Sequence, residues 1–235
     1  MFSYFDNSLA LGVELGTDSI KIVELEANNP LPRLKQFLIK QLSKTSIVGG
    51  VIKDYTRLKN RLKLILEDYE FNSREIIASV GEENIFIKRI SLPQMTEEEV
   101  EDVLRWEASD YISIPLDQVI MDYEIIDKSQ DKIELILVAI KEQIVENYVK
   151  LLEEIGFKVK AVELPFLALR RVLNLYPNFQ EGNVLLVDIG AELSKVTVFK
   201  QGKFSFRRSF NLLKKLKKRK ILILEKQRSI KRKQM

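Results

Sequence analysis

Two short segments, far apart in the chain, carry the residues whose types and spacing are best suited to chemistry. Residues 11–25 read LGVELGTDSIKIVEL, and residues 186–199 read LVDIGAELSKVTVF. When Gly16 is aligned with Gly190, each segment has an acid two positions before the glycine and a lysine five positions after it. The chain therefore contains one motif twice: an apolar strand, an acid, a polar turn with a glycine, and a second strand.

Such a turn is suited to holding a phosphate. A glycine lets the backbone approach a bound group closely, and successive backbone N–H groups in a turn can form a nest for an anion. Thr17, Ser19 and Ser194 add hydroxyl groups, and the acid at the strand end can hold Mg²⁺ through water. The alternative is two ordinary hairpins whose glycines serve only the turns. The second copy of the motif favours a pair of phosphate loops that clamp a triphosphate.

Composition excludes several classes of function. The chain of 235 residues has no cysteine and no histidine, which rules out disulfides, thiolate metal sites, His-based metal sites and Ser-His-Asp hydrolysis. Its hydrophobic fraction of 46% and charged fraction of 31% are those of an ordinary globular protein. No apolar run has the length of a spanning helix, and no signal peptide is recognisable, so we expect a cytoplasmic protein.

The net charge of +4 conceals an uneven distribution. Residues 212–235 hold eleven Lys or Arg and one acid, so residues 1–211 carry a net charge of −6. The body is mildly acidic and is followed by a strongly basic tail. The tail has no aromatic residues interleaved with its charges, so we expect no specific nucleic-acid binding.

Between the two copies of the motif, apolar periodicity predicts alternating strands and helices. Thr96 and Glu99 form a capping box that opens a helix, and Gly156 ends the helix after that. The predicted strands are residues 11–15, 20–26, 34–41, 76–80, 85–90, 121–126, 133–140, 158–162 and 183–189, with helices within 52–69, after 96, before 156 and at 166–175.

The duplicated loops resemble those of the actin-like ATPase superfamily, which includes actin, Hsp70, FtsA and MreB. Within it, the chain is most similar to the PilM family of type IV pilus assembly, over about residues 9–211. The most specific block is ISLPQMTEEEVEDVLRWEASDYISIPLDQVIMDYEII at residues 90–126, in which RWEA is followed by the pattern YI..P.

The resemblance implies an α/β fold, an actin-like (RNase H-like) ATPase lobe with an inserted α+β subdomain of the FtsA and PilM type. Subdomain 1A would comprise residues 9–90 and 162–181, and the insert, 1C, residues 91–161. Residues 182–211 would begin the second lobe, 2A. After Asn211 the sequence departs from the family, which leads to the expectation that the chain is truncated or frameshifted there and that most of the second lobe is missing.

The resemblance also implies a nucleotide site for ATP and Mg²⁺, with Glu14 and Asp188 next to the metal. The two phosphate loops would be formed by Glu14, Gly16, Thr17, Asp18, Ser19 and Lys21 and by Asp188, Gly190, Ala191 and Glu192. Because the Gly-rich adenosine-binding motif of the family has no counterpart here, we expect no measurable ATP binding by this chain. No catalytic residues are identifiable.

The partner implied by the resemblance is the cytoplasmic N-terminal peptide of a PilN-like inner-membrane protein. The insert would help form its groove, with Trp106, Tyr111, Ile112 and Pro115 near the partner surface; the alternative for Trp106 is a place in the core. Other inner-membrane pilus components, self-association, and peripheral attachment to the cytoplasmic face of the inner membrane through the partner are expected as well.

Two classes of function are therefore compared. One is a scaffold of type IV pilus assembly and twitching motility, and the other is a sugar-kinase-like phosphotransferase on the same fold. The scaffold is favoured because the best-matched block lies in the insert. For the tail, the alternatives to truncation are a segment that binds anionic lipid or nucleic acid, a partner-binding helix and a solvated end.

Overall fold

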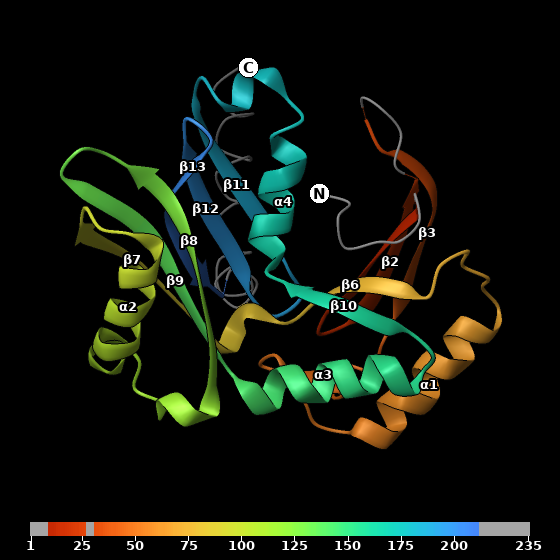
Figure 1. Cartoon of the computed structure of the whole chain (residues 1–235). Helices are drawn as coiled ribbons and strands as arrows, with labels where there is room; N and C mark the ends of the chain where they lie inside the picture. The colour runs from red at the N-terminus through yellow and green to blue at the C-terminus, as the bar shows by residue number, and fades with distance from the viewer. Residues whose placement is uncertain (1–8, 27–30, 212–235) are drawn as a thin grey trace, which may run out of the picture. The chain divides into compact units, whose positions relative to one another are not determined.

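The computed structural model describes residues 9–26 and 31–211, which form two compact units divided between Tyr176 and Pro177 (Figure 1). The basic tail at residues 212–235, and every expectation about it, lies outside the described residues. Within the described ranges, no helix is both long enough and apolar enough to cross a membrane.

The first unit is built on a five-stranded sheet in the order β10-β6-β1-β2-β3. Three of its strands form an antiparallel meander: β1 (Leu9–Leu15), β2 (Ser19–Glu26) and β3 (Arg33–Gln41). The other two, β6 (Glu75–Ser79) and β10 (Lys158–Glu163), are parallel neighbours, β6 beside β1 and β10 beside β6. The predicted hairpin and third strand are confirmed.

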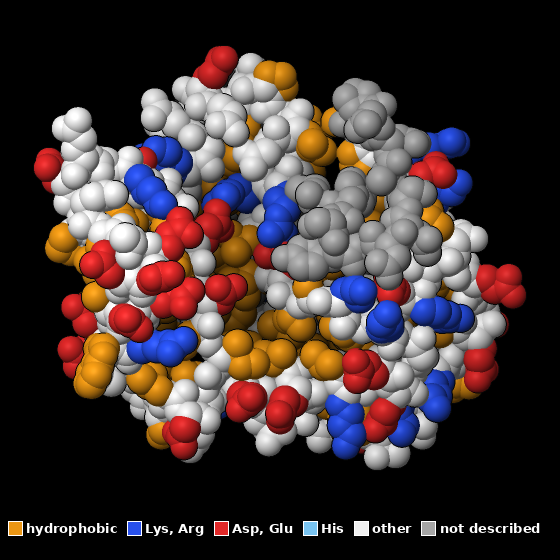
Figure 2. Space-filling model, viewed as in Figure 1, with side chains coloured by type: hydrophobic (Ala, Val, Ile, Leu, Met, Phe, Trp, Pro, Cys, Tyr) orange, Lys and Arg blue, Asp and Glu red, His pale blue; other side chains and the backbone are white. Residues whose placement is uncertain are grey.

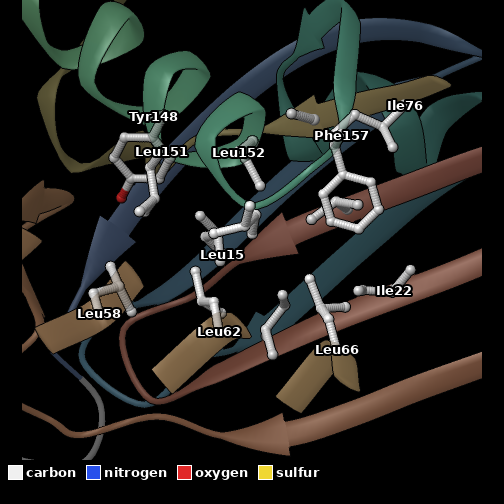
Figure 3. Close-up of a cluster of buried hydrophobic side chains, with 14 of the residues drawn as sticks. Leu15, Ile22, Leu58, Leu62, Leu66, Ile76, Tyr148, Leu151, Leu152 and Phe157 are labelled. Carbon is white, nitrogen blue, oxygen red and sulfur yellow. The ribbon is translucent and has the colours of Figure 1, made fainter. Parts of the chain in front are cut away.

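Two helices cover one face of this sheet, α1 (Tyr55–Glu67) and α3 (Glu142–Glu154) (Figure 1). A two-residue ladder, β4 (Ile47–Val48) with β5 (Val51–Ile52), precedes α1. Because side chains alternate along a strand, every second residue of β1 and β2 enters the core. Figure 3 shows leucines of α1 and α3 converging on Leu15, with Phe157 closing the cluster.

A second, three-stranded antiparallel sheet has the order β7-β9-β8. Its strands are β7 (Ile85–Pro93), β8 (Val119–Lys128) and β9 (Lys132–Lys141), with the short turns η1 (Glu82–Asn84) and η2 (Leu116–Gln118) before β7 and β8. The helix α2 (Glu97–Tyr111) covers one face of this sheet. Val100, Leu104 and Ala108 of α2 are buried against Leu135 and Leu137.

The bounds of the insert differ from the predicted 91–161. The smaller sheet begins with β7 at Ile85 and ends with β9 at Lys141, whereas α3 and β10 belong to the first sheet. Val159 pairs with Ile76, and Tyr148 and Leu151 of α3 are fully buried in the first core. Parallel pairing joins strands that are distant in sequence, so local patterns do not reveal it. The subdomain names 1A and 1C remain predictions.

The capping box at the start of α2 is confirmed. The Glu99 backbone N–H donates to Thr96 Oγ1 at 3.3 Å, and the Thr96 backbone N–H donates to Glu99 Oε2 at 2.7 Å. Thr96→Ala removes one acceptor from the helix start, so we expect the free energy of unfolding to fall by about 1 kcal/mol. Urea unfolding measures this. The exposed Ser113→Ala is the control and should change little; an equal loss in both would contradict the assignment.

Residues 164–211 contain the remaining elements. The helix α4 (Pro165–Leu173) ends the first unit, and η3 (Pro177–Phe179) begins the second. The second unit is a three-stranded antiparallel sheet of β11 (Asn183–Ile189), β12 (Ser194–Lys200) and β13 (Lys203–Phe210). Phe199 lies edge-on to Phe179 and Phe204, with ring centroids 5.4 and 6.5 Å away.

Candidate functional site

The repeated motif forms the same hairpin in both units. In the first, Glu14 of β1 lies opposite Lys21 of β2, and the Gly16 N–H donates to the Ser19 carbonyl at 2.9 Å. In the second, Asp188 of β11 lies opposite Lys195 of β12, and the Gly190 N–H donates to the Leu193 carbonyl at 3.1 Å. Register, turn length and turn hydrogen bond all agree between the two copies.

Both turns leave little room for a side chain at the glycine, the second turn less than the first. A Cβ on Gly16 would stand 3.2 Å from the Ser19 carbonyl oxygen, and one on Gly190 would stand 2.7 Å from the Leu193 carbonyl oxygen. The Gly16 N–H is already donated within its turn, so other groups of the loop would have to hold a phosphate. The alternative of two ordinary hairpins therefore explains why glycine occupies both positions. The evidence for a ligand rests on the neighbouring polar groups.

The first loop combines an ion pair with hydroxyl groups. Lys21 Nζ lies 2.8 Å from Glu14 Oε1, with the two side chains 49% and 43% exposed. Ser19 Oγ donates to Asp18 Oδ1 at 3.1 Å. A pair this exposed contributes little to stability, because water competes for both charges. A more highly charged anion such as a triphosphate would compete with Glu14 for Lys21.

The two loops belong to separate units of the structure, the first to residues 9–176 and the second to residues 177–211. Asp188, Gly190, Ala191 and Glu192 belong to the second unit, where Asp188 is half-buried at the end of β11. Among the described residues, no group of three or more His, Cys, Asp or Glu side chains could hold a metal ion. Single carboxylates such as Glu14 and Asp188 fit Mg²⁺ only as it accompanies a nucleotide, coordinated mostly by water and phosphate.

Parallel pairing adds two candidate residues that the sequence did not reveal. Ser79 at the end of β6 is in register with Glu14 and also with Glu163 of β10, so the three form one row at the carboxyl ends of parallel strands. Ligands of open α/β sheets bind at this edge. Glu163 forms an ion pair with Arg171 of α4. The strands were predictable, but the register that aligns these residues was not.

The four residues predicted to lie at the partner surface have different environments. Trp106 is 84% exposed, so its alternative place in the core is ruled out. Pro115 is exposed, and Tyr111 is half-buried, with Lys88 Nζ 3.3 Å from its ring centroid. Ile112 is only 4% exposed and belongs to the core beneath α2, so it supports the surface from inside.

The face of the smaller sheet opposite α2 carries a different set of side chains. On β8, Val119, Met121, Tyr123 and Ile125 pack toward the α2 core, which leaves the alternate residues on the other side. This surface, called the β8 face below, comprises Ile120, Asp122 and Glu124 of β8 and, from β9, Ile136 and Val138.

The β8 face combines apolar and acidic groups. Ile120 is 42% exposed, Asp122 is exposed, and Ile136 is buried although it lies outside the α2 core. Figure 2 shows acidic side chains gathered over β8. Glu124 accepts from Arg170 of α4, so α4 contacts the smaller sheet on this side.

Comparison with known families identifies the chain. The sequence profile of the family described as type IV pilus assembly protein PilM matches residues 12–213. The chain belongs to the PilM family. The solved structure of a PilM-PilN type IV pilus biogenesis complex matches with a TM-score of 0.77 and 23% identity, covering 86% of this chain and 61% of the other. This chain thus spans less than two thirds of that PilM-family protein.

A second solved structure shares the fold more distantly. It is the cytoplasmic domain of EpsL, an inner-membrane component of the type II secretion system of Vibrio cholerae, with a TM-score of 0.51 and 14% identity. The match covers 87% of this chain and 71% of that one. The predicted fold class, an actin-like α/β lobe with an inserted subdomain, is confirmed.

Proposed function

We propose that this PilM-family protein is a scaffold of type IV pilus assembly that binds a short cytoplasmic peptide of a PilN-like inner-membrane protein. The observation that carries the proposal is the family match over residues 12–213, which includes both the first sheet and the insert. Through this partner the protein would be held at the cytoplasmic face of the inner membrane. The related PilM-PilN complex supports the choice of partner.

The β8 face is the part of the insert that suits such a peptide. Segments on the cytoplasmic side of a membrane protein are enriched in Lys and Arg. Asp122 and Glu124 offer opposite charge, and the half-exposed Ile120 offers an apolar contact beside them. Short peptides bind by placing a few apolar anchors in a groove, with charges at its rim setting orientation.

The β8 face is preferred to the exposed side of α2 for a geometric reason. A groove between the first sheet and the insert needs walls from both, and the Arg170–Glu124 contact shows that α4 of the first unit reaches this face. Trp106 and Tyr111 lie on the opposite, α2 side of the smaller sheet. They are therefore proposed as a second surface for another pilus component.

Fluorescence anisotropy of the labelled N-terminal peptide of the PilN-like protein from the same organism tests the proposal. We expect saturable binding with a dissociation constant on the order of 1 µM, about tenfold weaker in Ile120→Ser because roughly 1.4 kcal/mol of apolar contact is lost. Val48→Ser is the matched control, since Val48 is also 42% exposed and lies on the β4–β5 hairpin. Weakening by Trp106→Ala instead of Ile120→Ser would move the peptide to α2.

A nucleotide forms the second part of the proposal. Each of the two hairpin turns has an acid and a lysine in register, and each is proposed to be able to hold phosphate oxygens of ATP, with Mg²⁺ carried on the nucleotide. When bound, the metal would neutralise phosphate charge, while Lys21 would exchange Glu14 for a phosphate oxygen. Because no Gly-rich adenosine-binding motif is recognisable in this sequence, calorimetric titration with MgATP tests this part in a PilM-family protein that has the motif. Saturable binding that the change equivalent to Lys21→Ala weakens would support it, and heats unaffected by that change would contradict it.

A further inference from the structure

A polar pocket lies apart from both candidate sites, between the loop that follows β3 and the first turns of α1. Its volume is about 590 Å³. Its polar lining consists of hydroxyl, amide and guanidinium groups, which belong to Ser43, Ser46, Thr56, Arg57, Asn60 and Arg61. No residue of the two hairpin turns or of the β8 face lines it.

Two arginines dominate the charge of this pocket. Arg57 and Arg61 are four residues apart, so both side chains lie on one face of α1, where like charges repel. Neither guanidinium has an ion-pair partner in residues 9–26 and 31–211, whereas Lys59 of the same helix pairs with Glu154 at 2.9 Å. Both guanidinium groups are therefore charged donors for which residues 9–26 and 31–211 provide no carboxylate partner.

The position of Arg57 in α1 is also electrostatically unfavourable. Arg57 stands in the first turn of α1, which contains no acid, and a cation there opposes the helix dipole. The one carboxylate that lines the pocket, Asp54, is engaged as the N-cap, where Oδ1 accepts from the Arg57 backbone N–H at 3.1 Å. One fixed negative charge thus faces two positive ones.

The pocket is held on a rigid base. Leu58 and Leu62, which alternate with the arginines along α1, are 1% and 0% exposed in the first core. Across the pocket, Ser46 is 2% exposed, and its backbone N–H donates to the Ser43 carbonyl at 2.9 Å. Both walls of the pocket are therefore fixed by backbone contacts or core packing.

We propose that this pocket binds a phosphate-type oxyanion, with Arg57 and Arg61 as its charged donors and the serine and threonine hydroxyls as neutral ones. Guanidinium groups match the geometry of phosphate oxygens and form strong charge-assisted hydrogen bonds with them. The phosphate group belongs either to a soluble compound or to an anionic phospholipid.

NMR titration of the ¹⁵N-labelled full chain with inorganic phosphate, at constant ionic strength, tests the site. The readout is residue-specific because the basic tail also attracts phosphate. We expect saturable shifts at the amides of residues 43–46 and 54–61, with a dissociation constant on the order of 1 mM, about tenfold weaker in Arg61→Gln. Lys63→Gln removes a charge from the same helix outside the pocket and should leave the affinity for phosphate within about twofold. Arg61→Lys keeps the charge in the pocket and should leave the affinity within about fivefold.

Vesicle sedimentation then distinguishes the source of the phosphate. The fraction of each variant that sediments with phosphatidylglycerol vesicles is compared, with phosphatidylcholine vesicles as the blank. A smaller bound fraction of Arg61→Gln than of Lys63→Gln identifies a phospholipid headgroup as the source. Vesicle binding that is equal in the two variants, together with the NMR shifts, identifies a soluble phosphate compound. Absence of shifts at residues 43–46 and 54–61, or equal weakening by Arg61→Gln and Lys63→Gln, overturns the proposal.

Discussion

Glu24→Ala is expected to lower the free energy of unfolding by about 3 kcal/mol, because it removes a buried carboxylate that accepts three hydrogen bonds. Glu24 on β2 is fully buried. Its carboxylate accepts from the Asn72 backbone N–H at 2.7 Å, from Asn72 Nδ2 at 3.0 Å and from Gln36 Nε2 at 2.8 Å. One side chain thus joins β2, β3 and the loop before β6. The half-buried Glu26, whose nearest cation Lys35 is 3.8 Å away, provides the control Glu26→Ala.

The effect of Glu24→Ala should depend on pH. Burial raises the pKa of Glu24, but the hydrogen bonds from Gln36 and Asn72 outweigh burial and lower the pKa below its ordinary value. Its stabilisation is therefore complete above the pKa of the unfolded chain, about 4.3, and is lost as pH falls through the lower pKa of the folded state. Urea unfolding should show a large difference from the unsubstituted protein near neutral pH and a smaller one in acid. A difference that is constant with pH would contradict this account.

Gly190→Ala should destabilise the second unit by about 2 kcal/mol. A Cβ would stand 2.7 Å from the Leu193 carbonyl oxygen, a backbone atom that cannot move without opening the turn. Hydrogen exchange of the β11 and β12 amides measures the change. Gly182→Ala is the control in the same unit, since its Cβ would lie 3.8 Å from the nearest atom. Gly16→Ala, at 3.2 Å, should cost less than Gly190→Ala. Equal exchange in the Gly190 and Gly182 variants would contradict the prediction.

Local patterns predicted the elements whose stability is local. The two hairpins need only alternating strands and a glycine turn, and the capping box needs only Thr96 and Glu99 at the right spacing. The burial of Glu24 was not predictable, because its partners Gln36 and Asn72 come from a neighbouring strand and a distant loop. An acid in an apolar strand looks like a solvent-facing residue until its partners are known.

The pairing of distant segments also explains why some residues of the candidate sites were not predicted from the sequence. The row of Glu14, Ser79 and Glu163 depends on the register of three parallel strands. The β8 face was missed for a related reason: alternation along β8 defines two sets of residues but does not show which set α2 covers. The helical periodicity around Trp106 likewise allowed that residue a place in the core, whereas the structure exposes it.

Site-specific photo-crosslinking in cells that assemble type IV pili tests the central claim most directly. A benzophenone amino acid placed at Ile120, at Trp106 or at Val48 of the full chain reports which side chains lie beside the PilN-like protein. We predict a crosslink from position 120, because Ile120 is the exposed apolar residue of the β8 face, and none from position 48 on the β4–β5 hairpin. No crosslink to the PilN-like protein from position 120, in cells where position 106 gives one, would contradict the proposed peptide site.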